Sequence, residues 1–335
     1  MAIRVEPRTA ISYVLLAVGI CVLVLFIRTV EIDLVLSSLR DAGVLPLVAA
    51  VAASLLNICI KAWRWHWMIV RVGSVRMSAG ASIGSIYAGV ASASLVPGKI
   101  VDFAKPLIAK GSCDVPLTQS TTAMLVERVV DTLSVALIFL VSLPFIPGIK
   151  GTVVQTAVLP FAAASVLIIL LALVFRQRFS TLLKALISRL PQDKRFVATL
   201  TSVVDRALNS LAASVDRSGL VVLLAFSLVS MVLEVARFYL VFLSIGIQIN
   251  WFAVALLYTA SILVSFVSLV PGGVGVTEAF QAASLGLLLQ DGSAREVAKG
   301  AVLLDRVISY YAVVAIGAVI LVLYQRSHLA AQRQQ

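Results

Sequence analysis

Long apolar segments recur along this chain. Three of them, Ile11–Ile27, Leu45–Ile60 and Ser218–Leu233, contain no charged residue. A helix of about 20 apolar residues crosses a hydrocarbon layer of about 30 Å. The pattern therefore predicts six membrane-spanning helices, at about residues 11–28, 44–62, 119–143, 152–175, 218–240 and 298–324.

Two further apolar segments, at about residues 79–110 and 251–290, are each interrupted in the middle by Val-Pro-Gly. Proline removes a backbone donor and glycine admits backbone angles closed to other residues, so a helix breaks there. A break at membrane depth persists only where protein or a wet cavity satisfies the freed backbone groups. We expect an all-α polytopic membrane protein with six full spans plus two Pro-Gly-broken helical hairpins, which are re-entrant or cross fully.

Composition agrees with the hydropathy pattern. Of the 335 residues, 61% are hydrophobic and only 13% are charged, whereas about 25% are charged in a soluble domain. The mean hydropathy is +1.05. The net charge of +11 is carried by residues at the ends of apolar segments rather than on a soluble surface, which favours membrane topology over nucleic-acid binding.

The basic residues also predict an orientation. With the N-terminus inside, the basic stretches 61–78 and 176–217 and the C-terminal tail all fall on the cytoplasmic side. The short connections 144–151 and 246–250, which are nearly free of lysine and arginine, fall outside. We expect a multi-pass protein of the cell inner membrane with cytoplasmic N- and C-termini. Residues 176–217 form either amphipathic helices on the anionic inner leaflet or a solvated linker.

An internal repeat divides the chain. Ser94-Leu95-Val96-Pro97-Gly98 recurs 174 residues later, Arg64 with its following aromatic recurs as Arg237-Phe238, and Glu127-Arg128-Val129 recurs as Asp305-Arg306-Val307. We expect a single membrane domain over 1–335, with repeat one at about 11–143 and repeat two at about 152–324. The predicted topology makes the two halves inverted, which is the arrangement of many transporters.

The two hairpin turns carry candidate binding residues. The first turn is followed by Lys99, Asp102 and Lys105, and the second contains Gly272, Gly273 and Gly275 and is followed by Glu278. A glycine-rich turn that opens a helix presents backbone N–H groups suited to a phosphate, and lysines add point charges for an anionic headgroup. Alternatively, the glycines only permit a tight turn.

Ionisable residues inside the predicted spans are the second candidate group. Glu127, Arg128 and Asp131 begin one span, and Asp305 and Arg306 begin another. Such residues are costly in hydrocarbon and face a partner or a cavity, so the acid–arginine pairs either contact a substrate or lock hairpin to span. Arg64, among tryptophans, is interpreted as a snorkelling interfacial arginine, and Glu234 is the expected partner of Arg237.

The sequence holds little metal or redox chemistry. Its three cysteines are scattered and it has only two histidines, so neither a disulfide framework, a metal centre nor a cofactor is expected.

Taken together, the basic-aromatic second span, the first Pro-Gly turn followed by Asp and Lys, the Glu-Arg pair and Pro271-Gly272-Gly273-Val274-Gly275-Val276-Thr277-Glu278 resemble one family over nearly the whole chain. It is the membrane region of lysylphosphatidylglycerol synthase, a flippase-like family. The resemblance implies translocation of a lipid between leaflets. The chain ends about ten residues beyond the last predicted span, so the aminoacyl transfer of the full-length synthases is not expected here.

The leading hypothesis is a lipid translocase, not an enzyme, that moves an anionic or glycosylated phospholipid or a polyprenyl-linked lipid. One alternative is a non-catalytic partner or regulator of an envelope-lipid pathway, which implies a lipid-synthesising enzyme as partner. The other is an integral-membrane transferase that uses Asp102, Glu127 or Glu278 as general base.

Overall fold

The computed structural model describes residues 44–73, 75–94, 102–146, 217–268, 270–289 and 292–333, with isolated positions between 21 and 40 and between 156 and 167. Every regular element in these ranges is helical, which confirms the predicted all-helical class. The elements are α3 (Val44–Gly73), α4 (Ala79–Ala93), α5 (Ala104–Cys113), α6 (Leu117–Ser142), η2 (Leu143–Phe145), α10 (Arg217–Ser244), α11 (Trp251–Val267), η5 (Pro271–Gly273), α12 (Val276–Leu288), α13 (Gly292–Arg306), the π-helical η6 (Val307–Tyr311) and α14 (Ala312–Arg333).

Three stretches of helix among the described residues are long and apolar enough to cross a membrane: Val44–Arg71, Ser218–Ser244 and Ala294–Arg326. Each contains one predicted span and extends beyond it. Helix α6 covers the predicted span 119–143 except for its last residue, which begins η2. Of the other predicted segments, 11–28 and 152–175 lie mostly outside the described residues, and 176–217 lies outside them except for its last residue.

Helix α3 is longer than the span predicted at about 44–62 and includes much of the basic stretch 61–78. Helix α3 continues through it as far as Gly73. Trp65, Met68 and Ile69 are buried there, and they pack in one hydrophobic cluster with residues of α4, α5 and α6. This packing of an extended apolar face supports the additional turns of helix.

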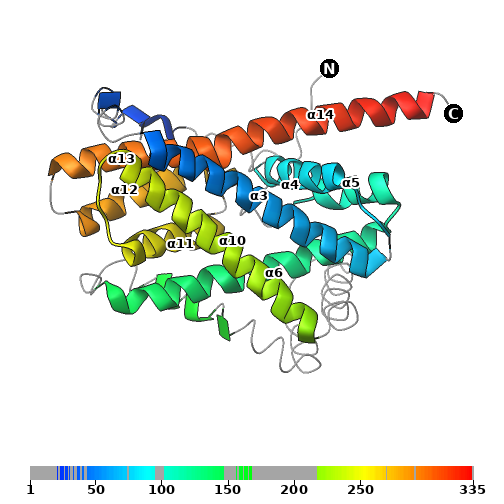
Figure 1. The fold of residues 1–335 in the computed structure, drawn as a ribbon, viewed down its shortest axis with the longest axis horizontal. Helices are drawn as coiled ribbons and strands as arrows, with labels where there is room; N and C mark the ends of the chain where they lie inside the picture. Colours follow the sequence, from blue (N-terminus) through cyan, green and yellow to red (C-terminus); the bar gives the residue numbers. More distant parts are fainter. Residues whose placement is uncertain are drawn as a thin grey trace, which may run out of the picture.

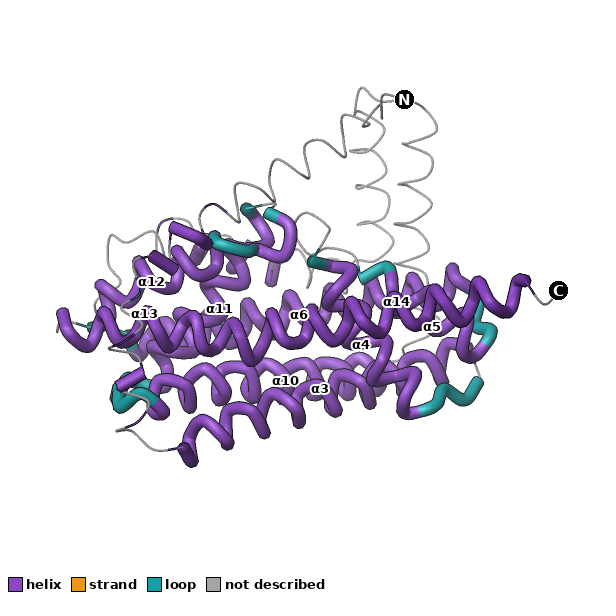
Figure 2. Tube along the Cα trace, turned by 90° about the horizontal axis from the view of Figure 1, so that it is seen from above, coloured by secondary structure: helices purple, strands orange, loops and turns teal. Residues whose placement is uncertain are grey.

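Helices α3 and α10 lie side by side and run in opposite directions across the centre of the molecule (Figure 1). The pair α4 and α5 lies toward one end of the molecule, and the pair α11 and α12 lies toward the other (Figures 1 and 2). Helix α14 packs along α4, and helix α6 packs along α11. Each helix pair is therefore held by a long helix from the opposite part of the sequence.

The second Val-Pro-Gly segment breaks the helix as predicted. Helix α11 ends at Val267, a turn follows at Pro271–Gly273, and α12 begins at Val276. Gly272 and Gly273 have φ angles of 67° and 62°, which L side chains rarely adopt. The first break lies between α4 and α5, and its residues 95–101, which include Lys99, lie outside the described residues. That the hairpins re-enter the membrane stays a prediction.

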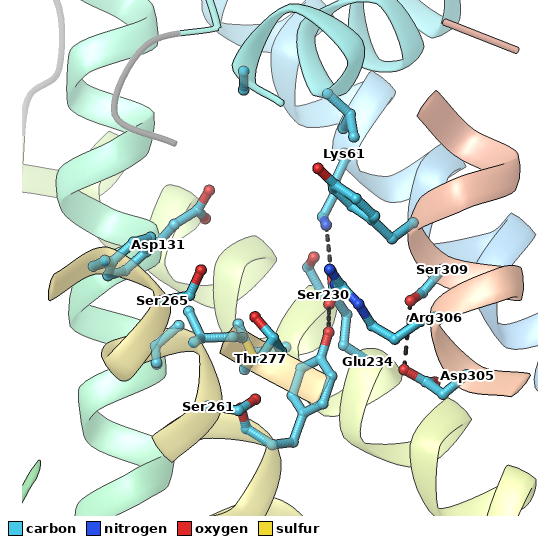
Figure 3. Close-up of a pocket in the computed structure, with 18 of the residues that line it drawn as sticks. Lys61, Asp131, Ser230, Glu234, Ser261, Ser265, Thr277, Asp305, Arg306 and Ser309 are labelled. Carbon is cyan, nitrogen blue, oxygen red and sulfur yellow. Dashed lines mark hydrogen bonds and ion pairs between the residues drawn. The ribbon is translucent and has the colours of Figure 1, made fainter. Parts of the chain in front are cut away.

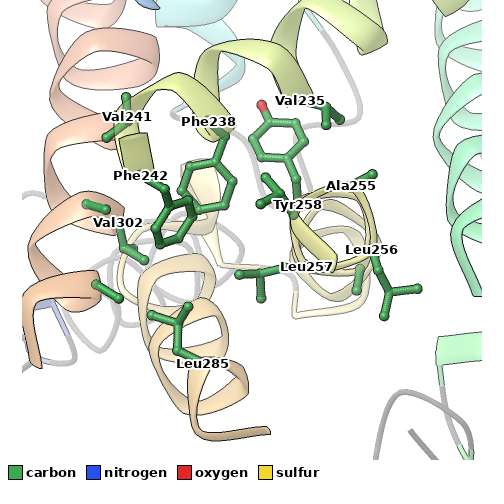
Figure 4. Packing of buried hydrophobic residues seen from close by; sticks show 14 of the residues in the cluster. Val235, Phe238, Val241, Phe242, Ala255, Leu256, Leu257, Tyr258, Leu285 and Val302 are labelled. Carbon is green, nitrogen blue, oxygen red and sulfur yellow. The ribbon is translucent and has the colours of Figure 1, made fainter. Parts of the chain in front are cut away.

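Two hydrophobic clusters support the two helix pairs. One gathers α10 to α13 with part of α6 and contains Phe238, Phe242 and Leu285 (Figure 4). The other contains Trp65 and gathers α3 to α6. Large apolar side chains also remain exposed along α3 and α14, as suits helices that face lipid.

Candidate functional site

Among the described residues, twelve ionisable side chains form the ion pairs that join different helices or hairpins of the core. They comprise six cations, Lys61, Arg64, Lys105, Arg128, Arg237 and Arg306, and six acids, Asp102, Glu127, Asp131, Glu234, Glu278 and Asp305. The formal charges of this set cancel. Buried charges are tolerated when they are paired in this way, and removing one partner exposes the full desolvation cost of the other.

Arg64 on α3 is at the centre of the first group of pairs. Its guanidinium donates to Glu127 at 2.5 Å and to Asp131 at 2.5 and 3.0 Å, and it also bonds the Ser227 hydroxyl on α10. The Lys105 ammonium on α5 donates to both carboxylate oxygens of Glu127 at 3.0 Å. Arg64 is only 1% exposed. Its interpretation as a snorkelling interfacial arginine was therefore wrong.

Arg237 on α10 has the same role in the second group. Its Nε donates to Asp305 at 2.7 Å, and its Nη2 donates to the Tyr258 hydroxyl at 3.1 Å. The expected partner Glu234 lies 3.9 Å away. The main partner of Arg237 is thus on α13, and not on its own helix.

A second pair in each half joins the acid-arginine dipeptide to a hairpin. Arg128 on α6 bonds Asp102, which immediately precedes α5. Arg306 at the end of α13 donates from Nε to Glu278 on α12 at 2.6 Å. The Tyr311 hydroxyl donates to the same Glu278 oxygen at 2.8 Å. The π-helical segment η6 directly follows Arg306 and contains Tyr311, and such segments are frequent at functional sites.

A polar contact also joins α3 to α10 where they cross. Lys61 and the Asn57 amide both donate to Glu234, the latter at 3.0 Å. The Ser230 hydroxyl donates to Asn57 at 2.6 Å, and the Tyr258 hydroxyl from α11 also donates to Glu234. The sequence distance from Asn57 to Ser230 and from Lys61 to Glu234 is 173, the same as from Arg64 to Arg237.

Seven of the paired side chains line a cavity of about 210 Å³, and several of the polar groups on its wall converge in Figure 3. Its wall comes from both hairpins and from α3, α6, α10 and α13–η6, with Lys61, Val90, Ala93, Ser94, Asp102, Arg128, Asp131, Val135, Ser227, Ser230, Met231, Glu234, Tyr258, Ser261, Ile262, Ser265, Phe266, Thr277, Gln281, Asp305, Arg306, Ser309 and Tyr310. The volume holds several water molecules or a small polar group. Among the charged groups of the wall with ion pairs, Arg128, Lys61 and Asp131 have the most exposed side chains, at 30%, 29% and 26%.

The predicted site residues divide into three groups. Asp102, Arg128, Asp131, Asp305 and Arg306 line the cavity. Lys105, Glu127 and Glu278 are buried behind them in ion pairs, so the ammonium of Lys105 is already bound to carboxylates. Gly272, Gly273 and Gly275 form the turn before α12, where the Gly273 N–H donates to the Val270 carbonyl. Lys99 lies outside the described residues.

Four residues of the site were not predicted from the sequence: Arg64, Lys61, Glu234 and Tyr258. A charge within an otherwise apolar helix was a usable signal for Lys61 and Glu234, since both follow uncharged runs. Tyr258 carried no such signal. In the ranges that the structure describes, no three His, Cys, Asp or Glu side chains are grouped as metal ligands.

A helical protein with long apolar helices and a charge-lined cavity between broken helix pairs belongs to the class of polytopic membrane proteins. More narrowly, residues 10–317 match the family described as the lysylphosphatidylglycerol synthase TM region, and the chain belongs to that family. It is similar to UPF0104 membrane protein PH1989 of Pyrococcus horikoshii, with 23% identity over 95% of this chain and 98% of the relative. A UPF0104 membrane protein of Methanothermobacter thermautotrophicus is 26% identical over 78% of each chain.

Proposed function

We propose that this protein is a lipid translocase, in which the polar head of a lipid crosses the membrane through the charged cavity. The observation that carries the proposal is the cavity itself. Its wall combines residues of both hairpins with charged side chains of α3, α6, α10 and α13, and three helical stretches are long enough to cross a membrane. Moving a polar head through hydrocarbon is the barrier that a translocase must lower. The family description connects the chain with a phospholipid-modifying system, which agrees with a lipid substrate.

We further propose that the two halves are inverted repeats. The same two kinds of ion pair occur in each half. Arg64 pairs with Glu127 of the acid-arginine dipeptide in the first half, as Arg237 pairs with Asp305 in the second. The arginines of the two dipeptides pair with an acid of the hairpin in the same half, Arg128 with Asp102 and Arg306 with Glu278. The antiparallel contact of α3 with α10 is what an axis in the membrane plane would produce (Figure 1). Inverted halves supply two access states around one site, because each half can adopt the conformation of the other.

The substrate in this proposal is an anionic or glycosylated phospholipid or a polyprenyl-linked lipid. Arg128 and Lys61 are the most exposed of the paired cations on the wall and would meet a phosphate first. Transport is downhill or coupled to an ion. The protein would act in the cell inner membrane, with both termini on the cytoplasmic side. Residues 176–217 would lie on the anionic inner leaflet, and a lipid-synthesising enzyme would be the protein partner.

We propose transport without a chemical step. The three candidate general bases, Asp102, Glu127 and Glu278, are each bound to a cation in the described structure. This pairing supports a structural and electrostatic role for the three acids.

The test is reconstitution in liposomes with fluorescent lipids, in which loss of outer-leaflet signal on adding a membrane-impermeant quencher reports translocation. Wild-type protein should accelerate movement of a labelled anionic phospholipid. Arg128→Gln and Arg306→Gln should slow it at least about tenfold, since each removes a cation from the cavity wall. The matched control is Lys299→Gln, whose partner is Glu296, 2.7 Å away on the same helix. No acceleration for any anionic or glycosylated lipid would overturn the proposal.

A further inference from the structure

Four neutral polar side chains of the second hairpin line one wall of the cavity. Ser261 and Ser265 lie one helical turn apart on α11, and Thr277 and Gln281 lie one turn apart on α12. All four are at most 5% exposed. Ser261, Ser265 and Thr277 lie on the same side of the cavity in Figure 3. The proposed transport of a charged head does not account for them.

Three of these side chains have polar atoms with no hydrogen-bond partner among the described residues: Ser265 Oγ, Thr277 Oγ1 and Gln281 Oε1. The Gln281 amide is fixed by donating from Nε2 to Ser261 Oγ at 2.9 Å, which leaves Oε1 as an available acceptor. By contrast, the buried hydroxyl of Thr259 on the same helix donates to the Ala255 carbonyl at 2.7 Å. Buried polar atoms normally have partners, so an unpartnered group on a cavity wall points to a ligand.

The two hydroxyls are close together beside the turn. Both Ser265 Oγ and Thr277 Oγ1 lie within 3.0 Å of the position that a Cβ on Gly273 would occupy, at 2.0 and 2.9 Å. Glycine at this position therefore leaves room for the two hydroxyls, which a larger residue would displace. Hydroxyls both donate and accept hydrogen bonds, and an amide oxygen accepts, which together match the hydroxyls of a polyol or sugar.

The wall of the same cavity also carries a charged group. Arg306 is held through Nε by Glu278, and its Nη2 has no hydrogen-bond partner among the described residues. Arg306 is 7% exposed. A guanidinium N–H is a strong donor to a phosphate oxygen. The wall therefore offers a cationic donor and a set of hydroxyl-binding groups.

In the described part of the first hairpin, two positions of this wall are not repeated. Ala91 lies 174 residues before Ser265, and Lys105 lies 176 residues before Gln281. Ala91 carries no polar group, and the Lys105 ammonium bonds Glu127. Maintenance of the repeated architecture thus does not require Ser265 or Gln281, and the polar groups at these two positions are specific to the second half.

We propose that Ser265, Thr277 and Gln281 form a subsite for a hydroxyl-bearing lipid head whose phosphodiester is bound by Arg306. This inference rests on the proposed function and narrows its substrate to phosphodiester lipids with a polyol or glycosyl head. Amine heads, which carry no hydroxyl, are excluded from the preferred class. A site built to hydrogen-bond a hydroxyl discriminates strongly against an analogue that lacks it.

Binding of short-chain lipids to the purified protein in detergent tests the subsite. Dioctanoyl phosphatidylglycerol and dioctanoyl phosphatidylpropanol have the same charge and nearly the same size, and only the first has head hydroxyls. Wild type should bind phosphatidylglycerol at least about tenfold more tightly. The double variant Ser265→Ala, Thr277→Val should lose that preference and bind phosphatidylpropanol as wild type does.

The control variant is Ser244→Ala with Thr259→Val, whose hydroxyls both bond carbonyls of their own helices. It should keep the preference. Equal binding of the two lipids by wild type, or tighter binding of dioctanoyl phosphatidylethanolamine, would overturn the inference. So would equal weakening of both lipids in the double variant. If the preference holds but liposomes show no translocation of any lipid, the subsite stands and the proposed transport fails.

Discussion

The buried pair of Arg237 and Asp305 allows a quantitative test of how the core is held together. The Arg237 guanidinium is 2.7 Å from the Asp305 carboxylate, and the two residues are 2% and 1% exposed. Arg237→Met leaves Asp305 buried with only a long hydrogen bond from the Ser309 hydroxyl, at 3.4 Å. Removing one partner of such a pair costs about 3–5 kcal/mol. We expect Arg237→Met to lower the free energy of unfolding by that amount.

The complementary variant and the double variant separate pairing from packing. Asp305→Asn leaves Arg237 close to Glu234, 3.9 Å away, so its loss should be at the lower end of the same range. Replacing both partners by neutral side chains removes the uncompensated charge, and such replacements are often neutral. The double variant should therefore be more stable than the sum of the single losses predicts, by about 2–3 kcal/mol.

The assay is chemical unfolding of purified protein in detergent micelles, followed by far-UV circular dichroism. Lys299→Met is the matched control, because Lys299 and Glu296 are also 2.7 Å apart but have side chains 20% and 34% exposed. Partly exposed pairs contribute about 0–1 kcal/mol. If Arg237→Met costs no more than Lys299→Met, or if the single losses add in the double variant, burial of the pair does not govern stability.

Two further substitutions test local geometry. A Cβ on Gly317 would lie 2.1 Å from the Tyr87 carbonyl oxygen, so Gly317→Ala should push α14 away from α4 and lower the free energy of unfolding by about 1–3 kcal/mol. The control is Gly80→Ala, which should be neutral or stabilising in thermal unfolding because a Cβ there has nothing within 4 Å. Equal effects of the two substitutions would contradict the close approach of α14 to α4. Tyr311→Phe removes the 2.8 Å hydrogen bond to Glu278 and should lower the free energy of unfolding by about 1.5–3 kcal/mol in the same assay. A decrease below about 0.5 kcal/mol would show that this hydrogen bond contributes little to stability.

The sequence predicted the parts of the site that follow from local rules. Val-Pro-Gly marked the break between α11 and α12, because proline and glycine act on the backbone regardless of what surrounds them. The acid-arginine dipeptides were identified as facing the hairpins, and Arg128 and Arg306 do bond Asp102 and Glu278. Their cost in an apolar setting made them conspicuous.

Other parts of the site could not be predicted from local rules. Arg64 sits among tryptophans, a pattern shared by arginines at a membrane surface and by buried arginines. Its burial depends on α3 extending to Gly73 and packing against α6 and α10. The neutral residues Ser265, Thr277 and Gln281 gave no signal, because serine and threonine in apolar helices usually bond their own backbone.

The sequence by itself determined that this is a helical membrane protein, where its second hairpin breaks, and which charges stand inside apolar helices. These properties depend on residues adjacent in the chain and on the cost of polar groups in hydrocarbon. Tertiary structure alone decided that Arg237 meets Asp305, that Lys61 meets Glu234, and that a cavity lies among them. Such partners are 68 and 173 residues apart, so the crossing and rotation of whole helices select them.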